Sequence, residues 1–398
     1  QPENLCTILR FAIQFFTISS LAIVILLTGC SRLRPHNYEY VYVSARRPIY
    51  LRDRVAPVSN HTGQVINGER LQVLDRMHRF VKVKTEQGAV GWIEEPAVID
   101  QKTYDSFLAL QKQHAQDQVV AHAILRDDMY MHVAPGVKTE HFYLIPANTK
   151  LEMLARVSVP KAGAVPMAPR TQPTAPVLKT IKPKKAAEEK GEPNVPMSAV
   201  PMNDWWLVRD GMGHTGWMLG RQLDVDVPDD IAQYSESQRM VGAYVLRTVS
   251  DPDSGKPNGQ VPEYVTLLTP YKNGLPYDFD QVRVFTWDVK HHRYGTAFRQ
   301  RNLAGYFPVT VGQQDFGSGP EPVFSIKVAV NNNISIDPET GVAHPTQTEI
   351  LHYRLDGNLV RRVLPPGTQS AVVPQVTKRG HTGHHRPHSH TRHRPSHG

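Results

Sequence analysis

The chain has 398 residues, of which 40% are hydrophobic and 21% charged, and its formal net charge is +8. This length suffices for two to four domains with more than one core. The excess positive charge gathers in residues 179–190 and 379–398, whereas a nucleic-acid-binding domain carries its charge on a folded face, so we expect no nucleic-acid partner. The two cysteines, Cys6 and Cys30, lie outside the segments that look folded, which excludes a disulfide framework and a four-cysteine zinc site.

An apolar run occupies residues 11–27, follows Arg10 and leads into Leu-Thr-Gly-Cys at Cys30. A short hydrophobic stretch followed by small residues is typical of a secretory signal rather than of a membrane span. This Leu-Thr-Gly-Cys sequence resembles the lipobox of bacterial lipoproteins, which implies cleavage before Cys30 and acylation of its sulfur. We therefore expect a signal peptide over 1–29, a tether over 30–39 and a membrane-anchored chain. A plain cleaved signal and an uncleaved N-terminal anchor are the alternatives.

Further features refine this expectation of the N-terminus. Ser31 follows the lipobox cysteine and resembles a residue that sorts lipoproteins to the outer membrane, facing the periplasm. The sequence begins with Gln1 rather than Met, so we expect further residues before it.

The phrase Gly-x-x-Gly-Trp occurs twice, at 88–92 and at 213–217, and the segments before it also align. The spacings from Ile49 to Leu71 and from Met129 to Leu151 are equal, and only the interval before Trp205 is longer in the second copy. We therefore predict two copies of one small domain, over 40–100 and 119–225, with an insertion at 159–203 in the second. Proline is frequent in that insertion and disfavours helices and central strands, so we expect a disordered or polyproline-II loop.

Each copy has short stretches of alternating apolar and polar residues between turn signals, which favours a small barrel or sandwich. Their order and the closing Gly-x-x-Gly-Trp resemble the bacterial SH3 (SH3b) domain. The matching residues of the first copy are Ile49, Leu51, Arg52, Leu71, Val73, Leu74, Phe80, Val83, Gly88, Gly91 and Trp92. Those of the second copy are Met129, Met131, His132, Pro135, Gly136, Leu151, Leu154, Trp205, Val208, Gly213, Gly216 and Trp217.

This resemblance implies two SH3-like barrels and, as ligand, the peptide stems of the bacterial cell wall. The chain departs from the family pattern in two places, since no Gly-Pro follows Arg52 and since His132 stands where arginine is usual. Trp92 and Trp217 either cap their barrels or form the floor of a groove for extended peptides. The candidate groove residues are Tyr50, Arg52, Trp92, Tyr130, His132, Trp206 and Trp217.

The two glycines of the phrase have separate predicted roles. The first, Gly88 or Gly213, is expected to adopt the positive φ of a tight hairpin turn. The second, Gly91 or Gly216, is expected to let the chain pass close to a neighbouring strand.

Between and after the copies, the pattern predicts short linking helices and a third domain. Asp100 caps an amphipathic helix within the linker 101–118, with Tyr104, Phe107, Leu108 and Gln111 on one face, and 229–240 is a similar segment. Residues 241–366 contain successive strand-like stretches and belong to no family that we recognise. The expected fold is mainly β, with two small SH3-like barrels, a C-terminal antiparallel β-sandwich or open barrel, and short linking helices.

The sequence gives no motif for catalysis. After Cys30 no cysteine remains to act as a nucleophile, and the adjacent His291 and His292 would face opposite sides of a strand. Asp278, Asp280 and Asp251 fit turns better than a calcium site. We expect no enzymatic activity, although a hydrolase with an unrecognised site stays an alternative.

The tail 367–398 has the composition of a disordered segment and is rich in histidine and arginine. We expect no cofactor. The open question is whether the tail is only a basic segment attracted to anionic lipopolysaccharide, or whether it binds nickel, zinc or copper weakly. Its candidate ligands are His381, His384, His385, His388, His390, His393 and His397.

Taken together, the sequence predicts a lipid-anchored protein of the cell envelope that binds peptidoglycan or envelope proteins through its SH3-like domains. An envelope-assembly or metal-buffering lipoprotein is the alternative.

Overall fold

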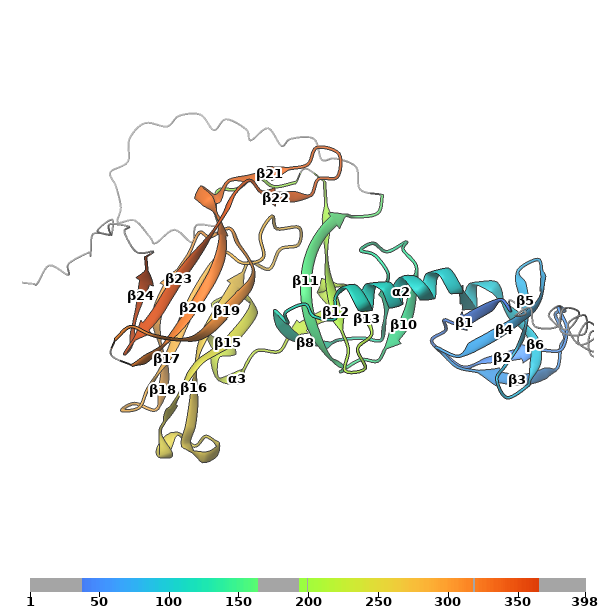
Figure 1. Cartoon of the computed structure of the whole chain (residues 1–398), viewed down its shortest axis with the longest axis horizontal. Coiled ribbons are helices and arrows are strands. Elements are labelled where there is room, and N and C mark those ends of the chain that lie inside the picture. The colour runs from blue at the N-terminus through green and yellow to red at the C-terminus, as the bar shows by residue number, and fades with distance from the viewer. Residues whose placement is uncertain (1–37, 164–192, 199, 318, 365–398) are drawn as a thin grey trace, which may run out of the picture.

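The computed structural model describes residues 38–163, 193–198, 200–317 and 319–364. Three β-rich units follow one another along the long axis of the molecule, and every sheet is antiparallel (Figure 1). The predicted mainly β fold is confirmed. The expected signal peptide and Cys30, most of the insertion and the tail histidines lie outside the described residues. Among the described residues, no helix has both the length and the apolar character needed to cross a membrane.

The first unit is one seven-stranded sheet in the order β3-β2-β6-β5-β4-β1-β7. Its strands are β1 (Tyr40–Val43), β2 (Ile49–Arg52), β3 (His61–Val65), β4 (Arg70–Met77), β5 (Phe80–Lys84), β6 (Val90–Glu94) and β7 (Val98–Asp100). Alternation along the strands sends Leu51, Val81, Val83 and Ile93 into a core that belongs to this unit alone. β3 and β7 are the two edges, so the sheet is open and not a barrel closed by hydrogen bonds.

The second unit repeats this order strand for strand, as β10-β9-β13-β12-β11-β8-β14. Its strands are β8 (Ala121–Leu125), β9 (Met129–His132), β10 (His141–Ile145), β11 (Lys150–Pro160), β12 (Met202–Arg209), β13 (Thr215–Leu219) and β14 (Leu223–Val225). The register repeats too, because Arg52 lies opposite Trp92 and His132 opposite Trp217. The two segments that align in the sequence therefore have the same strand topology.

The glycines of the repeated phrase behave as predicted. Gly88 and Gly213 lie in the hairpin turns with φ of +91° and +88°. A Cβ on Gly91 would lie 2.7 Å from the Cβ of Leu51, and a Cβ on Gly216 would lie 2.6 Å from the Cβ of Met131. In both copies the second glycine thus allows the close approach of β2 to β6 or of β9 to β13.

The prediction that all of 159–203 is loop is wrong at both ends. β11 and β12 continue their ladder through Val159↔Asn203 and Pro160↔Met202. Met202 also packs against Gly274 and Gly341 of the third unit. The proline here is the last residue of its strand, where it removes no hydrogen bond from the interior of the ladder. The high proline content of the insertion therefore did not exclude strand structure at its two ends.

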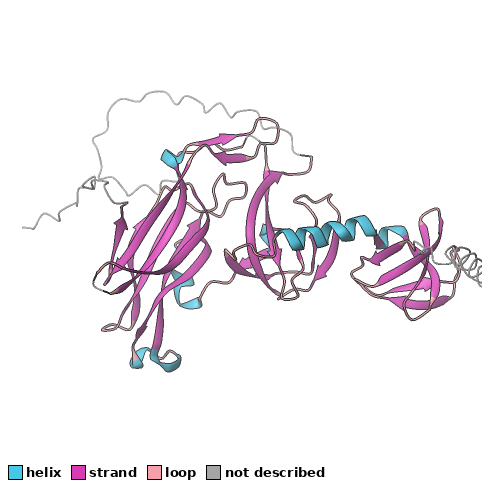
Figure 2. Ribbon diagram, in the orientation of Figure 1, coloured by secondary structure: helices cyan, strands magenta, loops and turns pink. Residues whose placement is uncertain are grey.

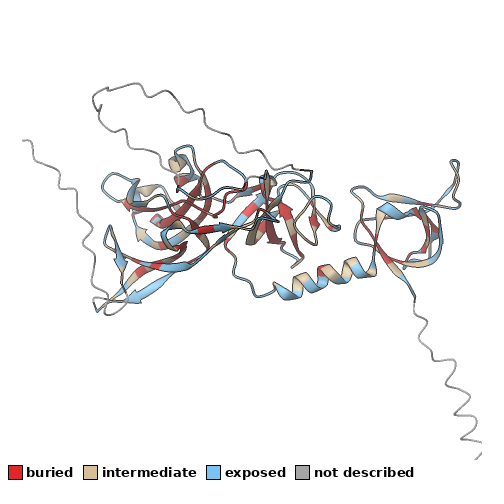
Figure 3. Cartoon of the chain, turned by 90° about the horizontal axis from the view of Figure 1, so that it is seen from above, coloured by how far each residue is buried: buried red, intermediate tan, exposed pale blue. Residues whose placement is uncertain are grey.

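The linking helix α2 (Gln101–Gln113) begins where predicted, with the Asp100 side chain accepting a hydrogen bond from the Thr103 amide at 2.8 Å. It joins the first two units, as the view from above shows (Figure 3). Phe107 is buried, but Leu108 is 42% exposed and does not belong to the packed face. The second predicted helix is also shorter than expected, since α3 spans only Asp229–Ala232.

The third unit is a sandwich of two four-stranded sheets (Figure 2). One sheet contains β15 (Arg239–Ser250), β16 (Gln260–Thr269), β17 (Gln281–Asp288) and β18 (Arg293–Gln300), in this order. The other has the order β19-β20-β23-β24, with β19 (Gly305–Asp315), β20 (Pro320–Ala329), β23 (Thr348–Asp356) and β24 (Leu359–Val363). A separate hairpin, β21 (Ile334–Ile336) and β22 (Ala343–Pro345), extends toward β11 and β12 (Figure 1).

The second unit and the sandwich share a core. The Trp206 ring meets the Phe307 ring edge-on at a centroid distance of 5.7 Å, within a buried cluster that includes residues of both units. Beside it, Arg156 of β11 donates to Asp204 at 2.9 Å and across the boundary to Asp278 at 3.1 Å. Burial alone would lower the pKa of Arg156, but these two carboxylates raise it above its ordinary value.

Candidate functional site

The first unit carries a set of aromatic and basic side chains on one outward face, which we call the first aromatic face: Tyr50, Arg52, His61, Phe80 and Trp92. Tyr50 is 51% exposed and stacks on His61 at a centroid distance of 4.3 Å with nearly parallel rings. Arg52 lies 6.0 Å from the centre of the Phe80 ring. These residues lie together because alternation on β2 turns Leu51 inward and its two neighbours outward.

Trp92 forms the base of this face. It pairs in register with Arg52 on one side and with Lys82 on the other, and the Lys82 ammonium lies 5.9 Å from the ring centre. Its ring is 7% exposed and lies outside the core cluster, to which its neighbour Ile93 belongs. Trp92 therefore covers the outer side of the sheet beneath the charged side chains that flank it.

The second unit has the corresponding set, the second aromatic face: Tyr130, His132, His141, Trp205 and Trp217. Tyr130 contacts His141 at a centroid distance of 4.7 Å, as Tyr50 contacts His61. The His132 ring meets Trp205 edge-on at 5.1 Å. Each member occupies the position of its counterpart in the first copy, so the two faces are equivalent in place and similar in composition.

Of the residues predicted to line the grooves, six lie on these faces and Trp206 does not. Trp206 and Trp205 are neighbours on β12, so their side chains point to opposite sides of the sheet. Trp206 enters the core shared with the sandwich, whereas Trp205 occupies the position of Phe80 on the other side of the sheet, where it is also buried, at 1% exposed. The expectation that Trp206 lines a groove is therefore wrong, because a later part of the chain covers it.

Four members of the faces were not among the predicted site residues, namely His61, His141, Phe80 and Trp205, and the two histidines were not noticed at all. A signal was available, since the offset that relates Ile49 to Met129 also relates these histidines to each other. Phe80 and Trp205 were aligned but were not proposed as site residues.

The two faces differ in charge. The first carries Arg52 and Lys82, with Arg52 3.8 Å from Glu94. The second has His132 in place of arginine, and burial together with repulsion from His141 lowers the pKa of His132. The first face therefore carries a guanidinium and an ammonium, whereas the second face has imidazoles, with Arg46 of the first unit beside Tyr130.

The first unit contacts the second beside the second aromatic face. Arg46 donates to the backbone oxygen of Asp128 at 3.1 Å, and its guanidinium lies 6.0 Å from the centre of the Tyr130 ring. Tyr42 stacks on Tyr104 of α2 at 3.8 Å. These contacts fix the spacing between the two faces.

Between these two units lies a cavity of about 480 Å³ with aromatic walls. Within it, Tyr143 stacks on His214 at 3.9 Å, and His214 Nδ1 lies 2.9 Å from Asp210 Oδ2. Burial is the main cause that raises the pKa of Tyr143 to about 12. The Asp210 carboxylate also accepts from the amides of Met212 and His214, so it holds the β12–β13 turn.

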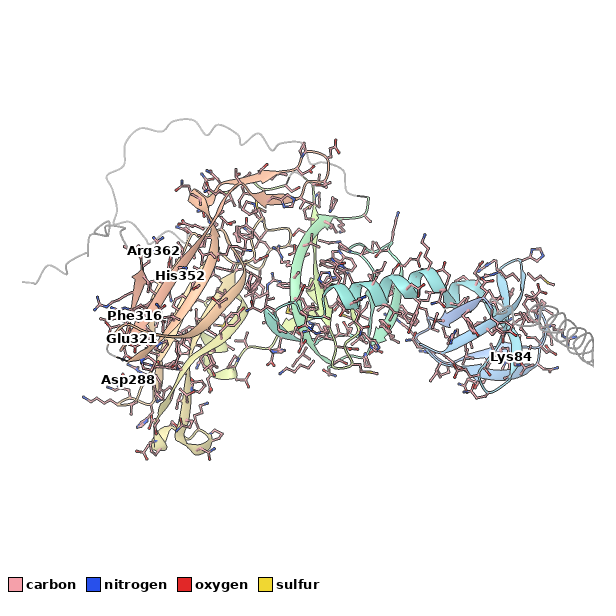
Figure 4. All side chains as sticks on the ribbon, in the orientation of Figure 1. Lys84, Asp288, Phe316, Glu321, His352 and Arg362 are labelled. Carbon is pink, nitrogen blue, oxygen red and sulfur yellow. The ribbon has the colours of Figure 1, made fainter. Side chains whose placement is uncertain are left out.

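Other polar clusters serve the fold. Asp251 accepts from the indole N–H of Trp287 at 2.7 Å and from its own turn, which agrees with the predicted turn role. Ser325 Oγ lies 2.7 Å from His352 Nδ1 on the exposed side of the outer sheet, where Figure 4 labels His352. Within the described ranges no group of three histidine, cysteine, aspartate or glutamate side chains is arranged to hold a metal ion.

Comparisons with known proteins add little to this geometry. No protein-family model and no curated protein matches the chain. Among solved structures, the chain is similar to one described as "Structure of NlpC2 from Trichomonas vaginalis", at 8% sequence identity. The match covers 67% of this chain and 93% of that chain, with a TM-score of 0.14. At that TM-score the similarity does not define a common fold, and nothing below depends on it.

Proposed function

We propose that this chain is a non-catalytic binding protein of the bacterial cell envelope, and that its two aromatic faces each hold a segment of extended peptide. The observation that carries the proposal is the recurrence of a tyrosine, a histidine and a tryptophan at equivalent positions in both copies. Packing of a single core does not require the same outward-facing rings twice, whereas binding a repetitive polymer at two points does.

The edges of the sheets favour an extended ligand. Among the described residues β3 pairs only with β2, and β10 only with β9, so each strand has a backbone edge open to a further strand. These edge strands carry His61 and His141. A peptide lying along such an edge gains main-chain hydrogen bonds, while the rings beside it contact its side chains.

The resemblance to bacterial SH3 domains supports cell-wall peptides as the ligand. These peptides carry carboxylates, and the first face offers Arg52 and Lys82 to them. The second face, with His132 in place of arginine, suits the less charged parts of the same chain. Two linked sites on one polymer bind more tightly than either alone, because the second event is intramolecular.

A pull-down on purified peptidoglycan tests the proposal with matched variants. Tyr50→Ala removes a face tyrosine, and Tyr38→Ala is its control, since Tyr38 is also 51% exposed but precedes β1. His141→Ala removes a face histidine, and His122→Ala, exposed on β8, is its control. One aromatic contact is worth about 0.5–1.5 kcal/mol, so each face variant should lower affinity about 2- to 10-fold.

The double variant Tyr50→Ala/His141→Ala should lose more retention than either single variant. Equal retention of the double variant and the unaltered chain would reject the two faces as the peptidoglycan site. Retention by the controls at the level of the face variants would indicate nonspecific adhesion instead.

The membrane attachment is tested separately. We infer from the lipobox resemblance that Cys30 bears the lipid and holds the protein at the outer membrane. Cys30→Ser should move the protein from the membrane fraction to the soluble fraction of the cell envelope, and unchanged fractionation contradicts the inference.

A further inference from the structure

A second kind of binding site lies away from both aromatic faces, in a cleft of about 450 Å³ between the second unit and the sandwich. One wall contains β14 and the 3-10 turn before it, with Arg221. The other contains the segment that leads into β15, with Arg239, and the loop after β16, with Tyr271. Small-molecule sites typically enclose about 300–1,000 Å³. The cleft therefore has room for a compact ligand.

Of the three arginines that line the cleft, Arg126 has an ion-pair partner, whereas Arg221 and Arg239 have none among the described residues. Arg126 forms a bidentate ion pair with Asp224, in which the Arg126 Nε lies 3.0 Å from the carboxylate. Within the described part of the chain, no carboxylate lies within 4.0 Å of the side-chain nitrogens of Arg221 or Arg239. Neither guanidinium is therefore neutralised by a direct ion pair with a described residue.

The Arg239 guanidinium is the more unusual of the two. Its Nε is buried and has no hydrogen-bond partner in the described residues. Burial lowers its pKa, and Asp204 is the carboxylate whose charge most opposes this effect. Asp204 is already bound by Arg156 at 2.9 Å and by Ser158. A partly buried guanidinium without a hydrogen-bonded anion is costly, and an anionic ligand would remove that cost.

The inner side of Arg239 borders a second, much smaller space. Thr269 is its register partner on β16, and the Thr269 hydroxyl is likewise buried without a partner. Both residues line a chamber of about 20 Å³, which is enough for one water molecule. Such a water can serve Nε and the hydroxyl, and Arg239 also lines the open cleft.

Tyr271 gives the cleft a planar apolar rim, since its ring lines the cleft and is 70% exposed. We propose that this cleft, called here the arginine cleft, binds a small anion with a planar or apolar body, whose carboxylate or phosphate is held by Arg239 and Arg221 while its body packs on Tyr271. Guanidinium groups suit both anions because their planar fork matches two oxygens at once.

Three matched probes test the proposal by calorimetry on the purified chain: benzoate, phenylphosphate and the neutral isostere benzamide. We expect saturable one-to-one binding of at least one anion and at least 10-fold weaker binding of benzamide. Raising the salt concentration from 50 to 500 mM should weaken anion binding several-fold, because the interaction is electrostatic. Binding of benzoate alone assigns the site to carboxylates, and binding of phenylphosphate alone assigns it to phosphates.

Variants then locate the site. Arg221→Gln and Arg239→Gln should each weaken anion binding about 10-fold or more, and Tyr271→Ala should weaken it less. Arg361→Gln, on the exposed β24, is the matched control and should bind like the unaltered chain. Arg221 lies on a surface turn, so its variant tests the proposal even if Arg239→Gln disturbs folding.

Equal binding of benzamide and the anions, absence of binding of all three probes at millimolar concentration, or unchanged affinity in Arg221→Gln would each overturn the proposal. Since none of these residues belongs to the aromatic faces, peptidoglycan retention and anion binding can fail independently.

Discussion

The buried arginine that joins the second unit to the sandwich offers the sharpest test of how the molecule is held together. Arg156 donates to Asp204 and Asp278 and also to the backbone oxygens of Leu275 and Tyr277. Its side chain is 9% exposed, and those of the two aspartates are 6% and 14% exposed. Replacing it by methionine keeps most of the volume but leaves both carboxylates and both carbonyls largely buried without their cationic partner.

The size of the effect follows from what stays buried. Removing one partner of a buried ion pair typically destabilises a protein by about 3–5 kcal/mol, because the other charge is left uncompensated. We expect Arg156→Met to lose that amount from the unfolding step shared by the second unit and the sandwich. An exposed pair gives the comparison: Arg361 and Asp356 are 2.9 Å apart but 54% and 45% exposed, so Arg361→Met should cost no more than about 1 kcal/mol.

Urea unfolding followed by tryptophan fluorescence measures both variants, since every tryptophan except Trp92 lies in the two coupled units. In a double-mutant cycle, Asp204→Asn should be less harmful in the Arg156→Met background than alone, because it removes a charge that has lost its partner. A loss for Arg156→Met no larger than that for Arg361→Met would refute the reasoning, as would strict additivity of the cycle.

Three further predictions concern the second unit. Gly216→Ala places a Cβ 2.6 Å from the Cβ of Met131 and should lower the free energy of unfolding by about 1–3 kcal/mol. Gly211→Ala, which has open space around it, is the control and should leave the stability nearly unchanged. The midpoints of urea unfolding compare the two variants. Because burial lowers the folded-state pKa of His132, the unfolded chain binds more protons below about pH 6.5, so stability should fall as the pH drops from 7.5 to 5. His132→Gln should make the free energy of unfolding depend less on pH, and an unchanged pH dependence in this variant would contradict the prediction. Trp206→Ala should cost about 3–5 kcal/mol by opening a cavity beside the sandwich, and a loss below 1 kcal/mol in thermal or urea unfolding would show that the shared core does not depend on this ring.

Features that depend on neighbours along the chain could be predicted from the sequence. The cap at Asp100 and the positive φ of Gly88 and Gly213 follow from local sterics or hydrogen bonding. The repeated order of strands followed from equal spacings. Six of the candidate groove residues lie on the two faces because strand alternation is also a local rule.

What could not be predicted depends on contacts between distant parts of the chain. Both Trp205 and Trp206 are buried, and that Trp206 packs into the core shared with the sandwich depends on Phe307, about a hundred positions later. The pairing of Arg156 with Asp278 and the arginine cleft likewise require that the sandwich be placed against the second unit. Such placement has no signature in periodicity or spacing.

The two copies also differ in how independent they are. The first unit has a core cluster of its own, whereas the inner residues of the second belong to one cluster with the sandwich, which Tyr42 and Ile99 of the first unit also join. Substitutions in the core of the first copy therefore act mainly on that unit, while substitutions inside the second copy also act on the sandwich. Separating the first copy from the rest of the chain would expose Tyr42 and Ile99 to solvent.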